Sequence, residues 1–326
     1  MIGAVAEALR DCGAHVILGD EGSRSFSPES VEPDREWIHA LGKQHDITVI
    51  SFAKTGARYM RSGVPFPRRY LLARAALESD HIVNCANFQP HNVLGMSGAV
   101  KNMFNVVVGA QQSRLVQLFP DPCDLAKIIV DVCEIVRPAL SFLDLTSIRI
   151  AGEVDDARHV GLLLAGNEPS ALDAVAVQAI GTDAMKIPTL RAAEQRFPGR
   201  TDLSKIAVVD PDDYMAKLRQ SFDPLSAAPS RKRTFYDRVT DALNHTVLMP
   251  RPTINSSDCT NCGDCVRICP VSAIASNSLR NPKIIHADCA DCHLCIGACP
   301  EGAIDTRFIG IAKALRRLTN SSLLAS

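Results

Sequence analysis

Eight of the twelve cysteines in this 326-residue chain fall between positions 259 and 299. They form two runs with the same spacing, C-x2-C-x2-C-x3-C-P, in "CTNCGDCVRICP" and "CADCHLCIGACP". Three cysteines at this spacing can curl around one inorganic core, whereas the fourth lies too far round and ligates the other core. The pattern predicts two 4Fe–4S clusters, the first held by Cys259, Cys262, Cys265 and Cys299 and the second by Cys289, Cys292, Cys295 and Cys269.

Zinc and disulfides are the competing interpretations of these cysteines. A zinc site of four cysteines usually presents two C-x2-C pairs separated by a longer spacer. Disulfide frameworks are typical of short secreted chains, and "MIGAVAEALRDCG" lacks a secretory signal. Clusters fit best, and their chemistry is one-electron transfer. Because each half supplies one ligand to the cluster of the other, loss of one cluster should destabilise both halves. His293 could tune the second cluster or be an exposed loop residue.

Composition narrows the possible partners. The net charge is −1, so the whole chain lacks the excess of positive charge that is typical of nucleic-acid-binding proteins. No stretch approaches twenty uninterrupted apolar residues, so we expect no membrane span. We expect a cytoplasmic protein.

The cysteine-rich segment resembles the bacterial two-cluster ferredoxin domain, a small α+β fold. The resemblance covers about residues 252–307 and includes the endings "CPVSAI" and "CPEGAI" of the two halves. It implies a ferredoxin domain over 253–307 that exchanges electrons with a redox partner protein. Around it we expect a polar linker at 223–252 and an amphipathic helix and tail at 308–326, which would pack on the body or touch a membrane surface. The basic run at 231–233 could dock a partner or be solvated.

Residues 1–222 alternate between helical and strand patterns. Helices are predicted over 3–13, 34–45, 68–79, 124–138 and 168–181, and strands over 15–22, 46–53, 80–88, 147–152, 159–166 and 205–210. This alternation favours an α/β domain with a largely parallel sheet and helices on both faces. The chain opens with a helix where a strand usually comes first. Either that strand is missing or the start is internal to a longer gene product.

Two segments of this domain resemble the family filed as domain of unknown function 362. They are "QPHNVLGMSGAVKNMFNVVVG" at 89–109 and "EPSALDAVAVQAIG" at 168–181, followed here by the two-cluster ferredoxin. Gly98, Lys101 and Asn102 match the first family motif, Asp144 matches a strand-end aspartate, and Asp173 matches an aspartate on a helix. The resemblance implies architecture more than a particular reaction.

The glycine-rich motif is the best candidate for a ligand site. In open α/β sheets, ligands gather at the carboxyl ends of strands. Gly95 and Gly98 would let backbone N–H groups approach a ligand. Lys101 would add positive charge and Asn102 a donor–acceptor pair, which suits a carboxylate, an enolate or a phosphate. The structural alternative is a tight turn in which Lys101 caps a helix or forms an ion pair.

Two further side chains could serve this site. His91 could donate a proton, because the ordinary pKa of histidine suits neutral pH, or it could be structural. Asp144 could be a partly buried base or the partner of the lysine. Asp173 is expected to stabilise a helix turn.

The sequence leaves the enzyme question open. The first hypothesis is a ferredoxin-coupled oxidoreductase acting on a small carboxylate or phosphate, although no flavin or nicotinamide signature is visible. The second is a non-catalytic electron carrier or a docking module for a redox partner or a metallocofactor assembly system. A regulatory sensor is less favoured, since no nucleic-acid-binding element is seen.

Overall fold

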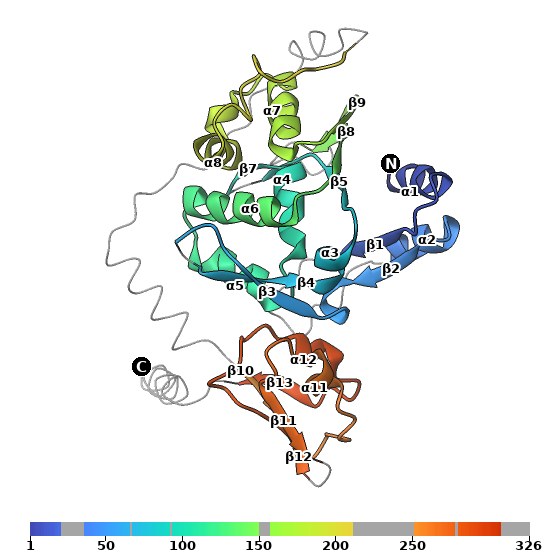
Figure 1. The fold of residues 1–326 in the computed structure, drawn as a ribbon, viewed down its shortest axis with the longest axis vertical. Helices are drawn as coiled ribbons and strands as arrows, with labels where there is room; N and C mark the ends of the chain where they lie inside the picture. The colour runs from blue at the N-terminus through green and yellow to red at the C-terminus, as the bar shows by residue number, and fades with distance from the viewer. Residues whose placement is uncertain are drawn as a thin grey trace, which may run out of the picture.

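The computed structural model describes residues 1–20, 36–65, 67–91, 93–149, 157–210, 251–277 and 280–307. Figure 1 shows an α/β domain, from blue to yellow, above a small cysteine-rich domain in orange and red.

An N-terminal unit pairs two helices with a two-stranded parallel sheet. Its elements are α1 (Ile2–Asp11), β1 (Ile17–Asp20), α2 (Glu36–Gln44) and β2 (Thr48–Ser51). β1 and β2 pair in parallel with Ile17 opposite Thr48. Gly13 follows α1 with a φ of 86°, a conformation that glycine adopts at little cost. All four elements lie where the sequence predicted them.

The segment after this unit forms a hairpin that the sequence analysis missed. The short helix η1 (Phe52–Lys54) leads into β3 (Ala57–Arg61), which pairs antiparallel with β4 (Arg69–Ala73). The helix predicted over 68–79 is therefore wrong in its first half, and only α3 (Arg74–Glu78) is helical. Tyr70, Leu71 and Leu72 are all fully buried, as in a strand that is covered on both faces. Strand pairing overrides the helical propensity of this apolar run.

The largest sheet has three strands in the order β5-β8-β9. These are β5 (Val83–Asn87), β8 (Leu140–Arg149) and β9 (Ala157–Gly166). β5 and β8 are parallel, whereas β8 and β9 are antiparallel. The described sheets are thus small and mixed, and the predicted largely parallel sheet is not confirmed. β9 follows β8 after a connection too short for a crossover helix, which leaves antiparallel pairing as the available arrangement.

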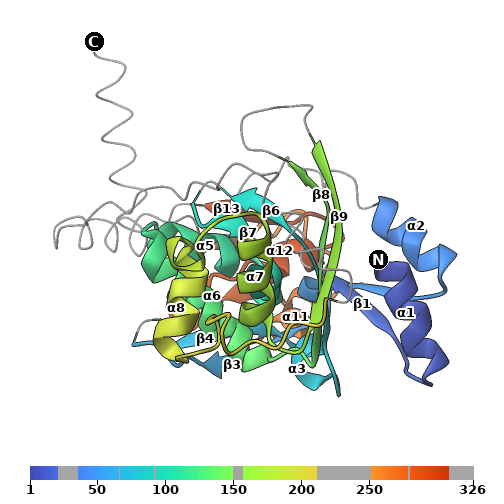
Figure 2. The ribbon, with the colours of Figure 1, turned by 90° about the horizontal axis from the view of Figure 1, so that it is seen from above.

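Helices cover this sheet on the side that also carries the candidate site. They are α4 (Ala99–Asn102), η2 (Met103–Val106), α5 (Ala110–Leu118), α6 (Pro122–Val136), α7 (Pro169–Ala179), η3 (Ala184–Lys186) and α8 (Pro188–Arg196). Figure 2 shows α6, α7 and α8 on one side of β8 and β9, while α1 and α2 lie beside β1. A strand predicted at 205–210 is not formed. The hairpin of β6 (Gln89–His91) and β7 (Gly95–Ser97) leads directly into α4.

The long helix α6 anchors the surrounding loops. Its N-terminus is capped by Asp121, whose side chain accepts from the N–H of Cys123 at 2.8 Å. In its middle, the buried Asp131 accepts from the hydroxyl of Tyr70 at 2.9 Å and pairs with Arg196 at 2.6 Å. This pairing satisfies a charge that would otherwise be costly to bury. It ties the β3–β4 hairpin and α8 to the same helix.

The cysteine-rich domain consists of two similar halves. Its elements are β10 (Arg251–Ile254), α11 (Asp264–Ile268), β11 (Ile274–Asn277), β12 (Arg280–Ile284), α12 (Leu294–Ala298) and β13 (Ile304–Arg307). β10 pairs antiparallel with β13, and β11 pairs antiparallel with β12. In Figure 1 the β11–β12 hairpin points away from the α/β domain, whereas α12 lies next to it.

Several predictions fall on parts of the chain outside the described residues. These are most of the linker at 223–252, the basic run at 231–233 and the helix and tail at 308–326. Among the described residues, no helix is long and apolar enough to cross a membrane.

Candidate cluster sites and anion site

The eight cysteines of the predicted clusters surround two separate cavities. One cavity is lined by Cys259, Cys262, Cys265 and Cys299. The other is lined by Cys269, Cys289, Cys292 and Cys295. The structure thus brings the cysteines together in the crossed combination that the sequence predicts. We call the first group site I and the second group site II.

Each loop turns its cysteines inward through residues with positive φ. In site I these are Asn261 and Gly263, with φ values of 60° and 80°. In site II they are Asp291 and His293, with φ values of 49° and 59°. A positive φ is strained for residues other than glycine. The fold therefore holds Asn261, Asp291 and His293 in a backbone conformation that they would not favour by themselves.

Backbone N–H groups point at several of the cysteine sulfurs. The N–H of Ala273 lies 3.2 Å from Sγ of Cys269, and the N–H of Ala303 lies 3.3 Å from Sγ of Cys299. These contacts occupy equivalent places in the two halves. Hydrogen bonds to cluster sulfurs are one of the means by which proteins set reduction potentials.

Four cysteines line each cavity, which is the donor set of a 4Fe–4S cluster. Among the described residues, no group of three or more His, Cys, Asp or Glu side chains converges on a position for one ion. The sulfurs instead surround cavities. Burial raises the pKa of Cys292 to about 11 and that of Cys295 to about 12, and the neighbouring thiols contribute to the increase. A cationic core would therefore be needed to keep four thiolates together.

The buried ring of His293 is a further observation that bears on site II. The residue lines the site II cavity, and within the described residues its Nε2 is buried without a hydrogen-bond partner. An N–H at that position would find an acceptor in a cluster sulfide. His293 is half-buried and is therefore not the exposed loop residue that the sequence left open as an alternative to a role in tuning the second cluster.

Lys101 and His91 form the centre of the second candidate site. Lys101 lies on α4 and His91 ends β6. Burial lowers the pKa of Lys101, and burial together with the charge of Lys101 lowers the pKa of His91. In the described part of the chain, no carboxylate pairs with Lys101. The ion pair considered for this lysine is not found among those residues, which leaves a partly desolvated cation beside a neutral imidazole.

The orientation of His91 is set by its own turn. Its Nδ1 accepts from the N–H groups of Val93 and Leu94, both at 3.2 Å. An Nδ1 that accepts two hydrogen bonds places the proton of the neutral ring on Nε2. His91 is therefore arranged as a hydrogen-bond donor. Its lowered pKa disfavours the protonated ring at neutral pH, so the predicted role of His91 as a proton donor is less favourable.

Asp173 holds the start of α4 in place. Its carboxylate accepts from the N–H of Ala99 at 2.7 Å and from the N–H of Val100 at 3.0 Å. Burial raises the pKa of Asp173 to about 7 against the lowering effect of these two bonds. A side chain at Gly98 would lie 2.3 Å from the carboxylate, so glycine is needed for this contact. Asp173 thus caps α4, whereas the sequence predicted that it would stabilise the first turn of its own helix.

The N–H groups after Gly98 are thus used by the protein itself. The sequence predicts that Gly98 lets these N–H groups bind a ligand. That role loses its physical basis, because both groups already donate to Asp173. Gly95 has a φ of 77° and begins β7 opposite His91, where the backbone conformation alone favours glycine. Neither glycine therefore belongs to the candidate anion site.

Asn102 joins a chain of amides that the sequence analysis did not identify. Its Nδ2 donates to Oδ1 of Asn84 at 2.8 Å, and its Oδ1 accepts from Asn105 at 3.4 Å. Asn105 in turn accepts from Gln112 on α5 at 3.1 Å. The network connects β5, α4 and α5. The signal in the sequence was a polar Asn84 inside the apolar run of a buried strand.

Asp144 lies in the middle of β8 and not at a strand end. It is opposite Asn87 of β5, and its Oδ1 accepts from the N–H and the hydroxyl of Thr146 at 2.8 and 2.7 Å. None of these contacts reaches Lys101 or His91. The structure therefore brings together Lys101, His91 and the network of Asn102, but gives Asp144 a local role beside a strand irregularity.

These features define a two-domain protein in which a mixed α/β domain is joined to a cysteine-rich domain of the iron–sulfur class. The chain belongs to the family described as Domain of unknown function (DUF362), which matches residues 1–178. Residues 258–304 match the 4Fe-4S dicluster domain. A domain of that kind supports 4Fe–4S binding and electron transfer.

A curated relative is similar over part of the chain. The thylakoid-associated protein sll1697 of Synechocystis sp. is 27% identical over 198 residues. The match covers 60% of this chain and 60% of the relative, so the chain spans less than two thirds of the relative's length.

Proposed function

We propose that this chain carries two 4Fe–4S clusters, one in site I and one in site II, and acts as an oxidoreductase on a small anionic substrate bound in the α/β domain. When bound, the clusters supply or accept single electrons. Lys101 would bind the negative charge of a carboxylate or phosphate, and Nε2 of His91 would donate a hydrogen bond to it. Asn102 is a positioning residue that holds α4 against β5. A cytoplasmic location remains a prediction.

The observation that carries the anion site is the partly desolvated Lys101, which has no carboxylate partner among the described residues. A buried cation without a counter-charge is unfavourable, and an anionic ligand would supply that charge. His91 supports the same interpretation, because its neutral ring presents an N–H beside the lysine. The hairpin β6–β7 and the capped helix α4 fix both side chains on regular elements, which limits their movement.

The first experiment counts the clusters. Protein purified without oxygen should contain about eight irons and eight acid-labile sulfides per chain, since each 4Fe–4S cluster contains four of each. Zinc, or no iron and sulfide, would contradict the cluster assignment. About four of each would reduce it to one cluster.

The second experiment tests the anion site. Phosphate and malonate should each raise the unfolding temperature of the native protein, because a ligand that binds only the folded state stabilises it. Lys101→Met should abolish this shift. Lys127→Met is the matched control, since Lys127 is exposed and pairs with Asp124 on the outside of α6. Equal shifts in all three proteins would contradict an anion site at Lys101.

The pH dependence gives the same site a sharper signature. Burial lowers the pKa of Lys101, so this lysine loses its proton at a lower pH than an exposed lysine, whose pKa is about 10.4. The anion-induced shift should therefore decrease as the pH rises towards that value and should be largest at neutral pH. A shift that stays constant to pH 10.4 would show that the charge of Lys101 is not involved.

Catalysis is tested separately with chemically reduced protein. Oxidation of the reduced clusters by a small anionic compound alone would support the oxidoreductase, provided that Lys101→Met slows it. Oxidation by a protein partner alone would favour the non-catalytic carrier.

A further inference from the structure

The two cluster sites have different surroundings although their cysteine spacing is identical. In site I, Cys262 is exposed, as are its neighbours Thr260 and Asn261. In site II, the equivalent Cys292 has 8% of its surface exposed, and Leu294 has 2%. The difference comes from the α/β domain, which covers the loop of site II.

The covered loop is fixed by a backbone hydrogen bond and an apolar contact. The N–H of Ala110 donates to the carbonyl oxygen of Cys292 at 3.0 Å. Cys292 and Leu294 belong to one buried cluster of side chains with residues of the α/β domain, namely Ala53, Ala57, Leu71, Ala73 and Val108. A ligand of site II is therefore part of the hydrophobic core of the junction between the domains.

Gly109 permits this close approach. It has a φ of 61°, and a Cβ atom on it would lie 2.2 Å from the carbonyl oxygen of Cys292. No side chain fits there, because the obstructing atom belongs to the backbone. Position 109 of the α/β domain must therefore be glycine because of a backbone atom of the cysteine-rich domain.

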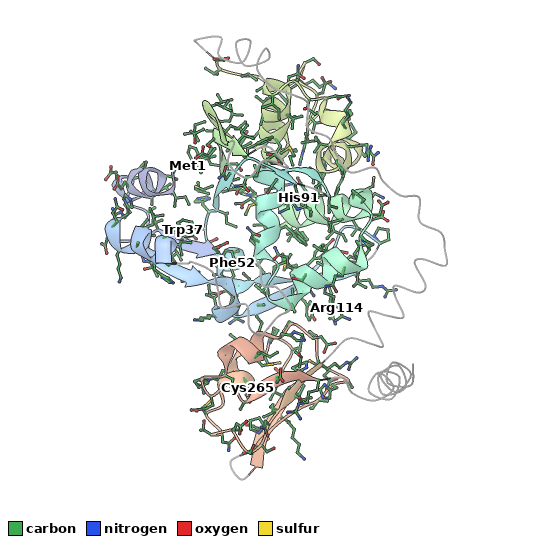
Figure 3. All side chains as sticks on the ribbon, turned by 180° about the vertical axis from the view of Figure 1, so that it is seen from behind. Met1, Trp37, Phe52, His91, Arg114 and Cys265 are labelled. Atoms are coloured by element: carbon green, nitrogen blue, oxygen red, sulfur yellow. The ribbon has the colours of Figure 1, made fainter. Side chains whose placement is uncertain are left out.

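Charges reinforce the contact at its edge. Asp291, whose side chain is 12% exposed, lies 3.5 Å from Arg114 of α5 and 3.8 Å from Arg251 of β10. Figure 3 shows Arg114 on the side of the α/β domain that faces the cysteine-rich domain, with His91 further inside. The equivalent residue of site I is Asn261, which is exposed and has no charge.

One continuous segment joins the junction to the candidate anion site. It begins with α4, which carries Lys101 and Asn102, and continues through η2 to Val108 and Ala110. The amide chain from Asn102 to Gln112 on α5 runs alongside it. Site II therefore contacts the segment that continues from the helix carrying Lys101, through Val108 and Ala110.

The exposed loop of site I has an acidic edge. Asp258 and Glu301 are both exposed, they flank the ligands Cys259 and Cys299, and Glu301 lines the cavity of site I. Asp264, in contrast, is paired with Arg267. Electrons can be exchanged with an external protein at this loop without moving the α/β domain, and complementary charge would favour a partner with a basic surface.

We infer that the two sites have separate roles: site II exchanges single electrons with the reducible small anion proposed to bind at Lys101, and site I exchanges them with an external one-electron redox protein that has a basic contact surface. This inference rests on the proposed function, and the bound anion gains each electron that the cluster of site II loses. Each exchange at site I moves one electron, so the partner is oxidised when the cluster is reduced, or the reverse, and no bond is made or broken. The electron then passes between the sites within the cysteine-rich domain.

The internal contact is tested by hydrogen exchange on the anaerobic, cluster-loaded protein. Amides of residues 289–294 and of Val108 to Ala110 should exchange more slowly than those of 259–264. Gly109→Ala should remove that protection. Gly181→Ala is the control, because Gly181 has a φ of 78° with open space around it and so adds a similar backbone strain without a clash. Equal exchange in the two loops, or protection that survives in Gly109→Ala, would overturn the inference.

The external contact is tested with oxidised cytochrome c as a basic one-electron acceptor. Asp258→Lys should slow its reduction by the protein about fivefold at low ionic strength, and salt should reduce the difference. Asp288→Lys is the matched control, since Asp288 is also exposed and precedes the first cysteine of site II as Asp258 precedes that of site I. Equal rates in both variants would overturn the assignment of site I.

The outcome can be separated from that of the proposed function. Absence of iron and sulfide would contradict the proposed function before either test is made. Full cluster content with two equally protected loops would leave the proposed function in place and reject the separate roles.

Discussion

The two halves of the ferredoxin domain share a cysteine pattern but lie in different environments. The loop of site I faces solvent at Thr260, Asn261 and Cys262. The loop of site II is packed against the α/β domain through Cys292 and Leu294. The comparison teaches that cysteine spacing specifies what can be bound, whereas the residues between the cysteines determine which neighbour each site has.

The substituted positions show how this difference is encoded. Gly263 and Asp264 follow the second cysteine of site I, and His293 and Leu294 follow that of site II. A glycine with positive φ is replaced by a histidine that keeps the conformation and fills space. A charged residue is replaced by a leucine that enters the junction. Both changes convert a solvated loop into a buried one.

The largest expected effect comes from removing one ligand in each half. Cys262→Ser and Cys292→Ser should both lower the iron content to less than half, because the crossed ligands couple the two sites. Only Cys292→Ser should also remove the hydrogen-exchange protection of Val108 to Ala110. Iron analysis and hydrogen exchange on the same samples measure both effects. Equal loss of protection in the two variants would mean that the junction depends on the clusters in general and not on the loop of site II.

An intermediate effect is expected from the residues at the equivalent positions 264 and 294. Leu294→Ala should destabilise the protein by about 2–5 kcal/mol, as for other buried leucines, because it leaves a cavity in the junction. Asp264→Ala removes an exposed pair with Arg267 and should cost about 1 kcal/mol or less. Urea unfolding without oxygen, followed by tryptophan fluorescence and by cluster absorbance, measures both. A small effect of Leu294→Ala would contradict the tight packing of the junction.

The smallest effect is expected at positions 261 and 291. Asp291→Asn removes the charge that faces Arg114 and Arg251 and should cost about 1 kcal/mol, less at high salt. Asn261→Asp makes the opposite change at an exposed position and should alter stability by about 0.5 kcal/mol or less. Unfolding in low and high salt distinguishes the two. A salt-independent effect at Asp291 would indicate that its packing, and not its charge, matters.

Much of the fold could be predicted from local patterns, and the failures have a common physical cause. The helices at α1, α6 and α7 and the strands at β1, β2 and β5 lie where periodicity placed them. The β3–β4 hairpin was missed because Tyr70 to Leu72 form an apolar run that suits a helix as well as a strand. The parallel sheet was overestimated because the direction of β9 depends on its partner strand.

Only some residues of the candidate anion site could be proposed from the sequence, and their role stays a prediction. Lys101, Asn102 and His91 could be named from the residue types in one short segment. The use of the N–H groups of Ala99 and Val100 by Asp173 could not be predicted, because Asp173 lies 74 and 73 positions away from them and meets them only when α7 packs beside α4. Gly109 was not identified at all, because the atom that excludes a side chain there belongs to the other domain.

The sequence alone was enough to identify the family and to predict the cysteine ligands and their crossed grouping, because spacing along one chain constrains which sulfurs can reach a common centre. The tertiary structure decided which of the two cysteine loops is buried, that Lys101 is partly desolvated, and that Asp173 takes the N–H groups after Gly98. Those properties depend on residues brought together from distant parts of the chain, and their burial and charge balance exist only once the chain has folded.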